Sequence, residues 1–175
     1  MATRLPIIHI ERLVERADGR FGRYRTDDLA ALLDAMAEAD IETPSTAFLA
    51  GGYCPIDRIE RPALLTTAET RLGWLAFWCQ RLASATYSSL LFLDSRTLDR
   101  PGHLSANDIP LVTGSGVVIA SQGTTGRPLV GLGVADLRAE LQESRRRLTE
   151  AAGYPIRLLA PRPTATGRCL DGLVM

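Results

Sequence analysis

Polar side chains follow several apolar runs of this sequence, at positions where proteins with parallel sheets carry their chemistry. Apolar runs stop just before Glu69, Asp94 and Gln122, and the last run is followed by Arg162. The carboxyl ends of parallel strands meet at one edge of a sheet, so we expect these four side chains to gather at one rim. Two carboxylates at such a rim are candidates for acid or base work.

The sequence contains two histidines, His9 and His103. His9 follows an apolar run with no second histidine near it, which is typical of a core or rim histidine rather than a metal ligand. His103 lies in a Pro-Gly turn, in a region that also contains Asp94, Asp99 and Asp108. An acid/base or metal site in that region therefore stays open as an alternative.

Three further groups of residues have ordinary structural explanations beside a functional one. The glycine-containing loop 121–127 could bind an anion through its backbone N–H groups, but it lacks both common phosphate-loop patterns. The cluster Arg145–Arg147 has acidic residues within one helical turn, which favours a solvated face over a site for an acidic partner. Trp74, Phe77 and Trp78 share one predicted helix and indicate core packing rather than a sugar-stacking platform.

Composition and charge narrow the class of protein. The 175 residues are 46% hydrophobic and 23% charged, which is typical of one globular domain, 1–175. The 20 basic and 20 acidic side chains balance, so we expect no nucleic-acid partner. All the basic residues are arginine, which excludes a Schiff-base lysine and a P-loop lysine.

The cysteines and the amino-terminal residues indicate a compartment. Three cysteines lie far apart without a metal-binding spacing, which fits a reducing environment. The first apolar run is too short for a signal peptide or a membrane span. We therefore expect a soluble, cytoplasmic protein with no membrane span.

Hydrophobic periodicity predicts that strands and helices alternate along the chain. We expect strands at 6–10, 63–67, 87–93, 117–120 and 156–160. We expect helices at 26–40, 70–85 and 135–152, the first with Thr26 as N-cap and the last ended by Gly153. Other segments are predicted as a loop at 11–25, a loop with a short strand or turn at 43–61, and short helices starting near 104–108 and 168–174. This alternation predicts an α/β fold with a mostly parallel sheet.

Several motifs in the second half of the chain occur in a recognisable order. They are Val117–Gln122, Thr124–Leu129, Leu137–Ser144, Gly153–Ile156 and Leu159–Thr164. Weaker matches lie upstream, at Pro6–His9, Arg61–Thr66 and Asp99–Ser105. Together these segments resemble the polysaccharide deacetylase family, also called the NodB homology domain, with the stretch 115–167 carrying the most specific likeness. The resemblance implies an incomplete (β/α) barrel, because the chain stops after the last predicted strand.

The resemblance also implies a chemistry that this sequence does not match. Enzymes of the family remove acetyl groups from N-acetylated sugar polymers, using an Asp and two His to hold a divalent cation, usually zinc, and a second Asp as base. The base position falls on Ala68, the metal Asp on Glu69, and the two metal His on Gln122 and Gly126. Glu69 alone among these four is a suitable metal ligand. The resemblance therefore predicts no catalytic residues, no bound metal and no cofactor.

Three functions remain open at this stage. The first is a catalytically inactive deacetylase-like protein that binds an acetylated sugar, another glycan or a protein in a groove lined by Glu69, Gln122, Arg127 and Arg162. The second is a hydrolase of carbohydrate amide bonds with a rearranged, zinc-dependent site that uses Glu69, Asp94 and His103. The third is an assembly subunit, because an open sheet edge presents unpaired backbone groups and favours homo- or hetero-oligomers.

Overall fold

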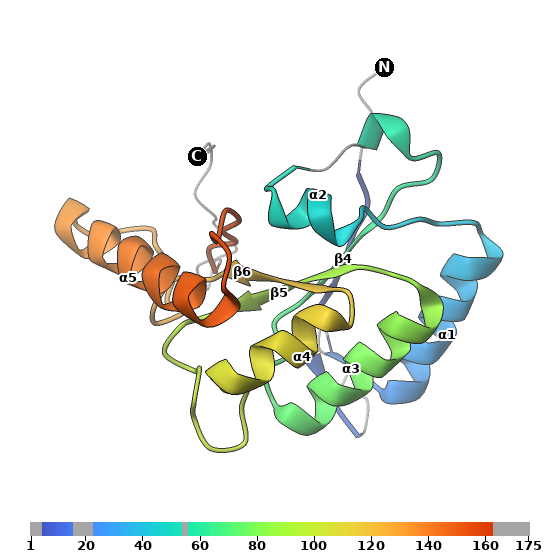
Figure 1. The fold of residues 1–175 in the computed structure, drawn as a ribbon, viewed down its shortest axis with the longest axis horizontal. Coiled ribbons are helices and arrows are strands. Elements are labelled where there is room, and N and C mark those ends of the chain that lie inside the picture. Colours follow the sequence, from blue (N-terminus) through green and yellow to red (C-terminus); the bar gives the residue numbers. More distant parts are fainter. Residues whose placement is uncertain (1–4, 16–22, 54–55, 163–175) are drawn as a thin grey trace.

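The computed structural model describes residues 5–15, 23–53 and 56–162. Its centre is a four-stranded parallel sheet with the strand order β1-β4-β5-β6 (Figure 1). The strands are β1 (Ile7–Ile10), β4 (Leu64–Thr67), β5 (Ser89–Leu93) and β6 (Val117–Ser121). The predicted α/β class and four of the predicted strands are therefore confirmed.

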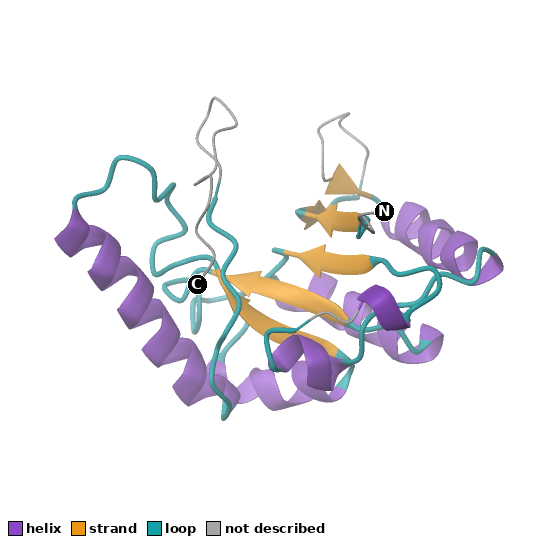
Figure 2. Ribbon diagram, turned by 90° about the horizontal axis from the view of Figure 1, so that it is seen from above, coloured by secondary structure: helices purple, strands orange, loops and turns teal. Residues whose placement is uncertain are grey.

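Helices pack around this sheet (Figures 1 and 2). They are α1 (Thr26–Glu38), α3 (Leu72–Ala85), α4 (Ile109–Gly114) and α5 (Val134–Ala152). The N-cap of α1 is Arg25 and not the predicted Thr26, because the Asp28 carboxylate accepts hydrogen bonds from both the backbone and the guanidinium of Arg25. Gly153 ends α5 as predicted, since it adopts the left-handed conformation at φ 74°.

The two faces of the sheet contribute to separate apolar clusters, because side chains alternate along a strand. Leu65, Leu91 and Ile119 pack with the buried residues of α1, α3 and α4 in the main core. The adjacent residues Leu90 and Val118 pack on the other face against Leu49. Trp78 is buried in the main core and donates a hydrogen bond to Ser89, so the prediction that it packs in the core is confirmed.

Leu49 belongs to α2 (Thr46–Ala50), which corrects the expectation of a short strand or turn there. A one-turn apolar segment has no periodicity that distinguishes helix from strand, and the contact of Leu49 with the sheet decides between them. A 3₁₀ helix at Ile56–Arg58 follows α2. Another, at Ala106–Asp108, leads directly into α4, so the short helix predicted there extends further than expected.

Two other predicted segments differ from the structure. Residues 156–160 form only an isolated bridge between Ser121 and Leu159, and not the predicted strand. Pro155 and Pro161 flank this segment and lack the N–H groups that would extend the pairing. The expected loop 11–25 contains two short parallel strands, β2 (Arg12–Leu13) and β3 (Arg23–Tyr24). The helix start predicted at 168–174 lies outside the described residues.

The sheet does not close into a barrel within the described part of the chain, in agreement with the predicted incomplete (β/α) barrel. β1 pairs with β4 on one side, and β6 is followed only by the bridge to Leu159. None of the described helices has the length and apolar character needed to cross a bilayer.

Candidate functional site

The four side chains expected at one rim line a single cavity at the carboxyl ends of β4, β5 and β6. Glu69 follows β4, Asp94 follows β5, Gln122 follows β6, and Arg162 comes from the segment beside β6. The cavity has a volume of about 110 Å³, and His103 also reaches it. The parallel order of the strands brings together residues that are far apart in the sequence.

Glu69 is 3% exposed and is held by its neighbours on both carboxylate oxygens. Its Oε1 accepts hydrogen bonds from the backbone N–H of Arg71 at 3.0 Å and from the Arg71 Nε at 2.8 Å. Its Oε2 accepts from the Arg71 Nη2 and from the backbone N–H of Leu13 at 3.2 Å. Glu69 therefore ties the end of β4 to β2.

The electrostatics of this pair favour the charged forms. Burial on its own raises the pKa of the Glu69 carboxyl, but the hydrogen bonds and charge of Arg71, with the Leu13 N–H, bring that pKa below its usual value. The same pairing raises the pKa of Arg71. The Arg71 guanidinium also donates to the Leu13 carbonyl at 2.7 Å and lies 5.8 Å from the ring centroid of Trp74. Glu69 is consequently an ionised structural carboxylate.

Gln122 and Arg162 contact each other across the cavity. The Arg162 Nε donates to the side-chain oxygen of Gln122 at 3.3 Å. The Gln122 backbone N–H donates to the carbonyl of Leu93, which fixes the end of β6 against β5. A guanidinium and an amide next to each other offer several hydrogen-bond donors to a polar ligand.

Gly126 lies directly against Asp94. A Cβ atom built at Gly126 would be 2.8 Å from the Asp94 Oδ2, and the backbone there has a φ of 65°. The Asp94 Oδ1 accepts the backbone N–H of Thr97 at 3.0 Å, so the carboxylate is held in place. A histidine at position 126 would need both this loop and Asp94 to shift.

Of the acidic residues predicted near His103, the structure places Asp94 in the cavity with it. Asp99 accepts the backbone N–H of Ala106, and Asp108 accepts the hydroxyl and backbone N–H of Ser105. These two carboxylates stabilise the turn that leads into α4. His103 itself forms a hydrogen bond between its Nδ1 and the Thr70 hydroxyl, at 2.7 Å.

His9 lies on β1, where its Nδ1 forms a hydrogen bond with the Thr66 hydroxyl at 2.8 Å. Burial lowers the pKa of this imidazole below its usual value, although the nearby Glu11 acts in the opposite direction. His9 does not line the cavity at the rim. The interpretation of His9 as a packed histidine agrees with this geometry.

Loop 121–127 does hold an anionic group, and that group belongs to the protein. The Oε1 of Glu140, on α5, accepts hydrogen bonds from the backbone N–H and the hydroxyl of Thr125, at 2.6 and 2.8 Å. Arg127 lies 3.9 Å from the other Glu140 oxygen and is 48% exposed at its side chain. The structure therefore separates Arg127 from Glu69, Gln122 and Arg162, with which it was expected to line one groove.

Sequence reasoning missed Arg71 and Glu140, the two residues that hold Glu69 and the loop. The acidic residues close to Arg145–Arg147 are expected on a solvated helix face, but one of them, Glu140, is 4% exposed. The sequence does contain a local signal for the Glu69–Arg71 pair: a basic residue two positions after a buried acid can form an ion pair with it. No sequence signal pairs Glu140 with Thr125, which lies 15 residues earlier.

The side chains at the rim do not fit the zinc ion that the family resemblance implies. Gly126 has no donor atom, Gln122 is a neutral amide, and both oxygens of Glu69 are already bonded. Among the described residues, no group of three or more His, Cys, Asp or Glu side chains could hold a metal ion.

No protein-family model and no curated protein matches this sequence. Solved structures do match its fold. The deacetylase PplD of Streptococcus pyogenes, solved with acetate, aligns at a TM-score of 0.79 and 10% identity over 95% of this chain and 78% of that one. The polysaccharide deacetylase BC0361 of Bacillus cereus aligns at 0.75 and 15% identity, and IcaB of Ammonifex degensii at 0.72 and 16%.

The matches cover unequal shares of these proteins. This chain is aligned over 94% of its length with BC0361 but covers 54% of that protein, and it covers 77% of IcaB. At these identities the likeness concerns the fold. The chain has the NodB-like fold of polysaccharide deacetylases, as its sequence motifs predicted.

Proposed function

We propose that this chain is a catalytically inactive, deacetylase-like protein that binds an acetylated glycan at the cavity at the carboxyl ends of β4, β5 and β6. One observation carries the proposal. Glu69 is the single donor retained from the family's base and metal positions, and Arg71 and Leu13 occupy its oxygens. The cavity keeps its place in the fold while the side chains that would activate water are absent or engaged.

The loss of catalysis follows from the groups at the four positions. Ala68 has no atom that accepts a proton. The Glu69 carboxylate is a weak base, because its pKa lies below the usual value and the donors of Arg71 and Leu13 occupy both of its oxygens. Asp94 and His103 line the same cavity, but Asp94 bonds the Thr97 N–H and His103 bonds Thr70. This arrangement supports binding over hydrolysis.

The dimensions and polarity of the cavity support recognition of an acetamido group. Its volume of about 110 Å³ equals that of about four water molecules in the liquid, which is smaller than a sugar ring. Phe92 supplies an apolar wall, and Gln122, Arg162 and Thr97 supply hydrogen-bonding groups. In this proposal the acetyl group enters the cavity and the sugar ring stays outside it.

The test compares binding of two sugars that differ in acetylation. We expect the N-acetylglucosamine tetramer to bind, by isothermal titration calorimetry, and the glucosamine tetramer to bind at least tenfold more weakly. Arg162→Ala should weaken binding of the acetylated tetramer about tenfold, since a charged hydrogen-bonding group is lost. Arg146→Ala is the matched control, because Arg146 is exposed and pairs with Glu143 and Glu150.

Two results would overturn this function. Equal binding of the two tetramers, or an unchanged affinity in Arg162→Ala, would remove the cavity as a glycan site. Release of acetate by the protein after loading with zinc would restore the hydrolase, and it would make the assignment of the four positions wrong.

A role in assembly is the second candidate, and it is favoured by the open sheet. β1 pairs on one side only among the described strands, and Ile7 on this strand is 62% exposed. A strand with a free edge and an exposed apolar side chain offers pairing to another chain. Light scattering should show an oligomer that Ile7→Lys dissociates, and a monomer at all concentrations would exclude self-assembly.

A further inference from the structure

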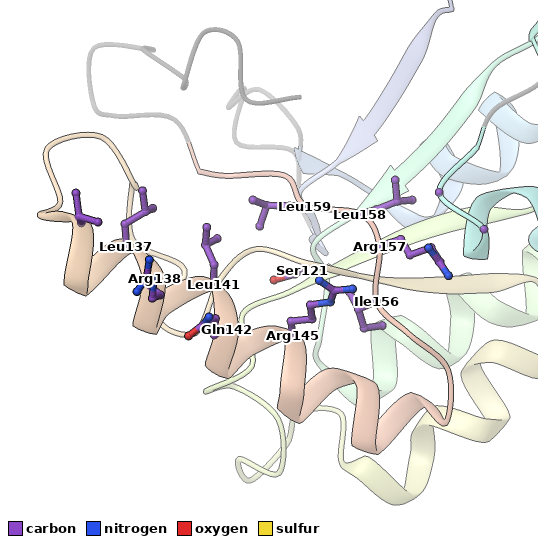
Figure 3. Close-up of a pocket in the computed structure, with 13 residues that line it drawn as sticks. Ser121, Leu137, Arg138, Leu141, Gln142, Arg145, Ile156, Arg157, Leu158 and Leu159 are labelled. Carbon is purple, nitrogen blue, oxygen red and sulfur yellow. The ribbon is translucent and has the colours of Figure 1, made fainter. Parts of the chain in front are cut away.

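A second and larger cavity lies between α5 and the segment 156–159 (Figure 3). Its volume is about 650 Å³, which is within the range of small-molecule sites. It shares no lining residue with the cavity at the rim. Its walls are mainly aliphatic: Leu137 and Leu141 come from α5, and Leu158 and Leu159 from the opposite segment.

The charged side chains that line this cavity are all positive. They are Arg138 and Arg145 on α5 and Arg157 on the opposite segment, and no acidic residue lines the cavity. None of the three has an ion-pair or hydrogen-bond partner among the residues that the structure describes. Figure 3 shows Arg145 extending from α5 toward Ile156, into the space between the two walls.

The acidic residues of α5 lie on its other sides. Glu143 and Glu150 both pair with Arg146, and the buried Glu140 faces loop 121–127. Residues three and four positions apart share a helix face, so Arg138, Leu141 and Arg145 point the same way. The positions four before and four after Arg145 are Leu141 and Thr149, which carry no charge. The arginines on the cavity side are therefore not neutralised by their own helix.

We propose that this cavity binds a medium-chain aliphatic carboxylate. The alkyl chain lies between Leu141 and Leu158, where its burial removes apolar surface from water on both partners. The carboxylate pairs with Arg145, whose planar guanidinium matches a carboxylate in a bidentate hydrogen-bonded pair. An aliphatic anion satisfies both properties of the cavity, since a neutral alkane would leave the arginines unpaired and a small anion would leave the leucines exposed.

The experiment is calorimetric titration of the full chain with decanoate and with the neutral analogue decanol. Decanoate should bind at least tenfold more tightly than decanol, and each methylene added between octanoate and decanoate should tighten binding about fourfold. Arg145→Ala should weaken decanoate binding about tenfold. Arg146→Ala removes the adjacent arginine from the side of α5 that bears Glu143 and Glu150, and should leave the affinity unchanged.

Leu141→Glu provides a second test, because it places a negative charge in the aliphatic part of the cavity. Leu141 is half-buried, so circular dichroism should show a folded variant that no longer binds decanoate. Equal affinities for decanoate and decanol, or equal losses in Arg145→Ala and Arg146→Ala, would overturn the proposal. The proposal would also be overturned if, in the ligand-free protein, the Leu141 methyl groups gave nuclear Overhauser contacts to the chain beyond residue 162 or to a second copy of the chain. Protein would then fill the cavity.

Discussion

The Glu69 carboxylate accepts three hydrogen bonds from Arg71, a residue two positions further along the chain. Together with the Leu13 N–H, this pairing occupies both oxygens of a carboxylate that is buried at the rim. Arg71 therefore supplies the positive charge beside the buried Glu69 carboxylate. The pair has a structural role, because it joins the residues after β4 to β2.

Replacing Arg71 should lower the stability of the protein, because it leaves the buried Glu69 carboxylate without its positively charged partner. In Arg71→Met the carboxylate keeps its buried position and loses its guanidinium partner, so we expect the free energy of unfolding to fall by about 2 kcal/mol, as measured in urea. The value is below that of a fully buried pair, because the Arg71 side chain is 36% exposed. Arg146→Met is the exposed control, with an expected loss below about 1 kcal/mol. Equal losses in the two variants would contradict a structural role for the Glu69–Arg71 pair.

The same pair predicts a dependence of stability on pH. The pKa of Glu69 in the folded protein lies below its ordinary value of 4.5, so the unfolded chain takes up this proton first. The stabilisation is fully present above pH 4.5 and is lost as the pH falls through the folded-state pKa. The difference in unfolding free energy between the wild-type protein and Arg71→Met should therefore shrink below pH 4.5. A difference in unfolding free energy that stays constant down to pH 3 would show that protonation of Glu69 does not control the stabilisation by Arg71.

Gly126→Ala should destabilise the loop that follows β6. The new Cβ would meet the Asp94 Oδ2 at 2.8 Å, in addition to the strain of a positive φ. Gly131→Ala is the matched control, because Gly131 also has a positive φ and no atom lies within 4 Å of its Cβ position. Thermal unfolding should show Gly126→Ala to be less stable than Gly131→Ala by about 1 kcal/mol or more. Asp94→Ala in the same chain removes the carboxylate but keeps the Asp94 Cβ, 3.0 Å from the new atom, so it should remove part of that excess. An excess that Asp94→Ala leaves unchanged would mean that the contact is not its cause.

Among the acidic residues of α5, Glu140 should cause the largest loss of stability when it is replaced by alanine. Glu140→Ala leaves the Thr125 N–H and hydroxyl without their acceptor, and we expect a loss of about 2 kcal/mol in the free energy of unfolding. Glu143→Ala on the same helix removes an exposed ion pair and should cost no more than about 0.5 kcal/mol. Hydrogen exchange at the Thr125 amide should accelerate in the first variant alone. Similar losses in both would contradict the anchoring of the loop by Glu140.

The sequence by itself determined the alternation of strands and helices, because periods of two and of 3.6 residues leave a pattern in the apolar positions. It also placed Glu69, Asp94, Gln122 and Arg162 at one rim, since parallel strands end at the same edge. The family resemblance assigns two of its site positions to Ala68 and Gly126, and neither residue has a side-chain atom that could bind a metal or accept a proton. These features depend on local order along the chain.

Only the tertiary structure decided which of those side chains are free to contact a ligand and which are bonded to other parts of the protein. Contacts between residues far apart in sequence bond Leu13 to Glu69, press Gly126 against Asp94 and turn Arg127 toward Glu140. A side chain's partners depend on the packing of whole elements, and no spacing in the sequence encodes a bond across 56 residues. For the same reason α2 is helical where its short apolar run was ambiguous: Leu49 is buried only when the segment packs on the sheet.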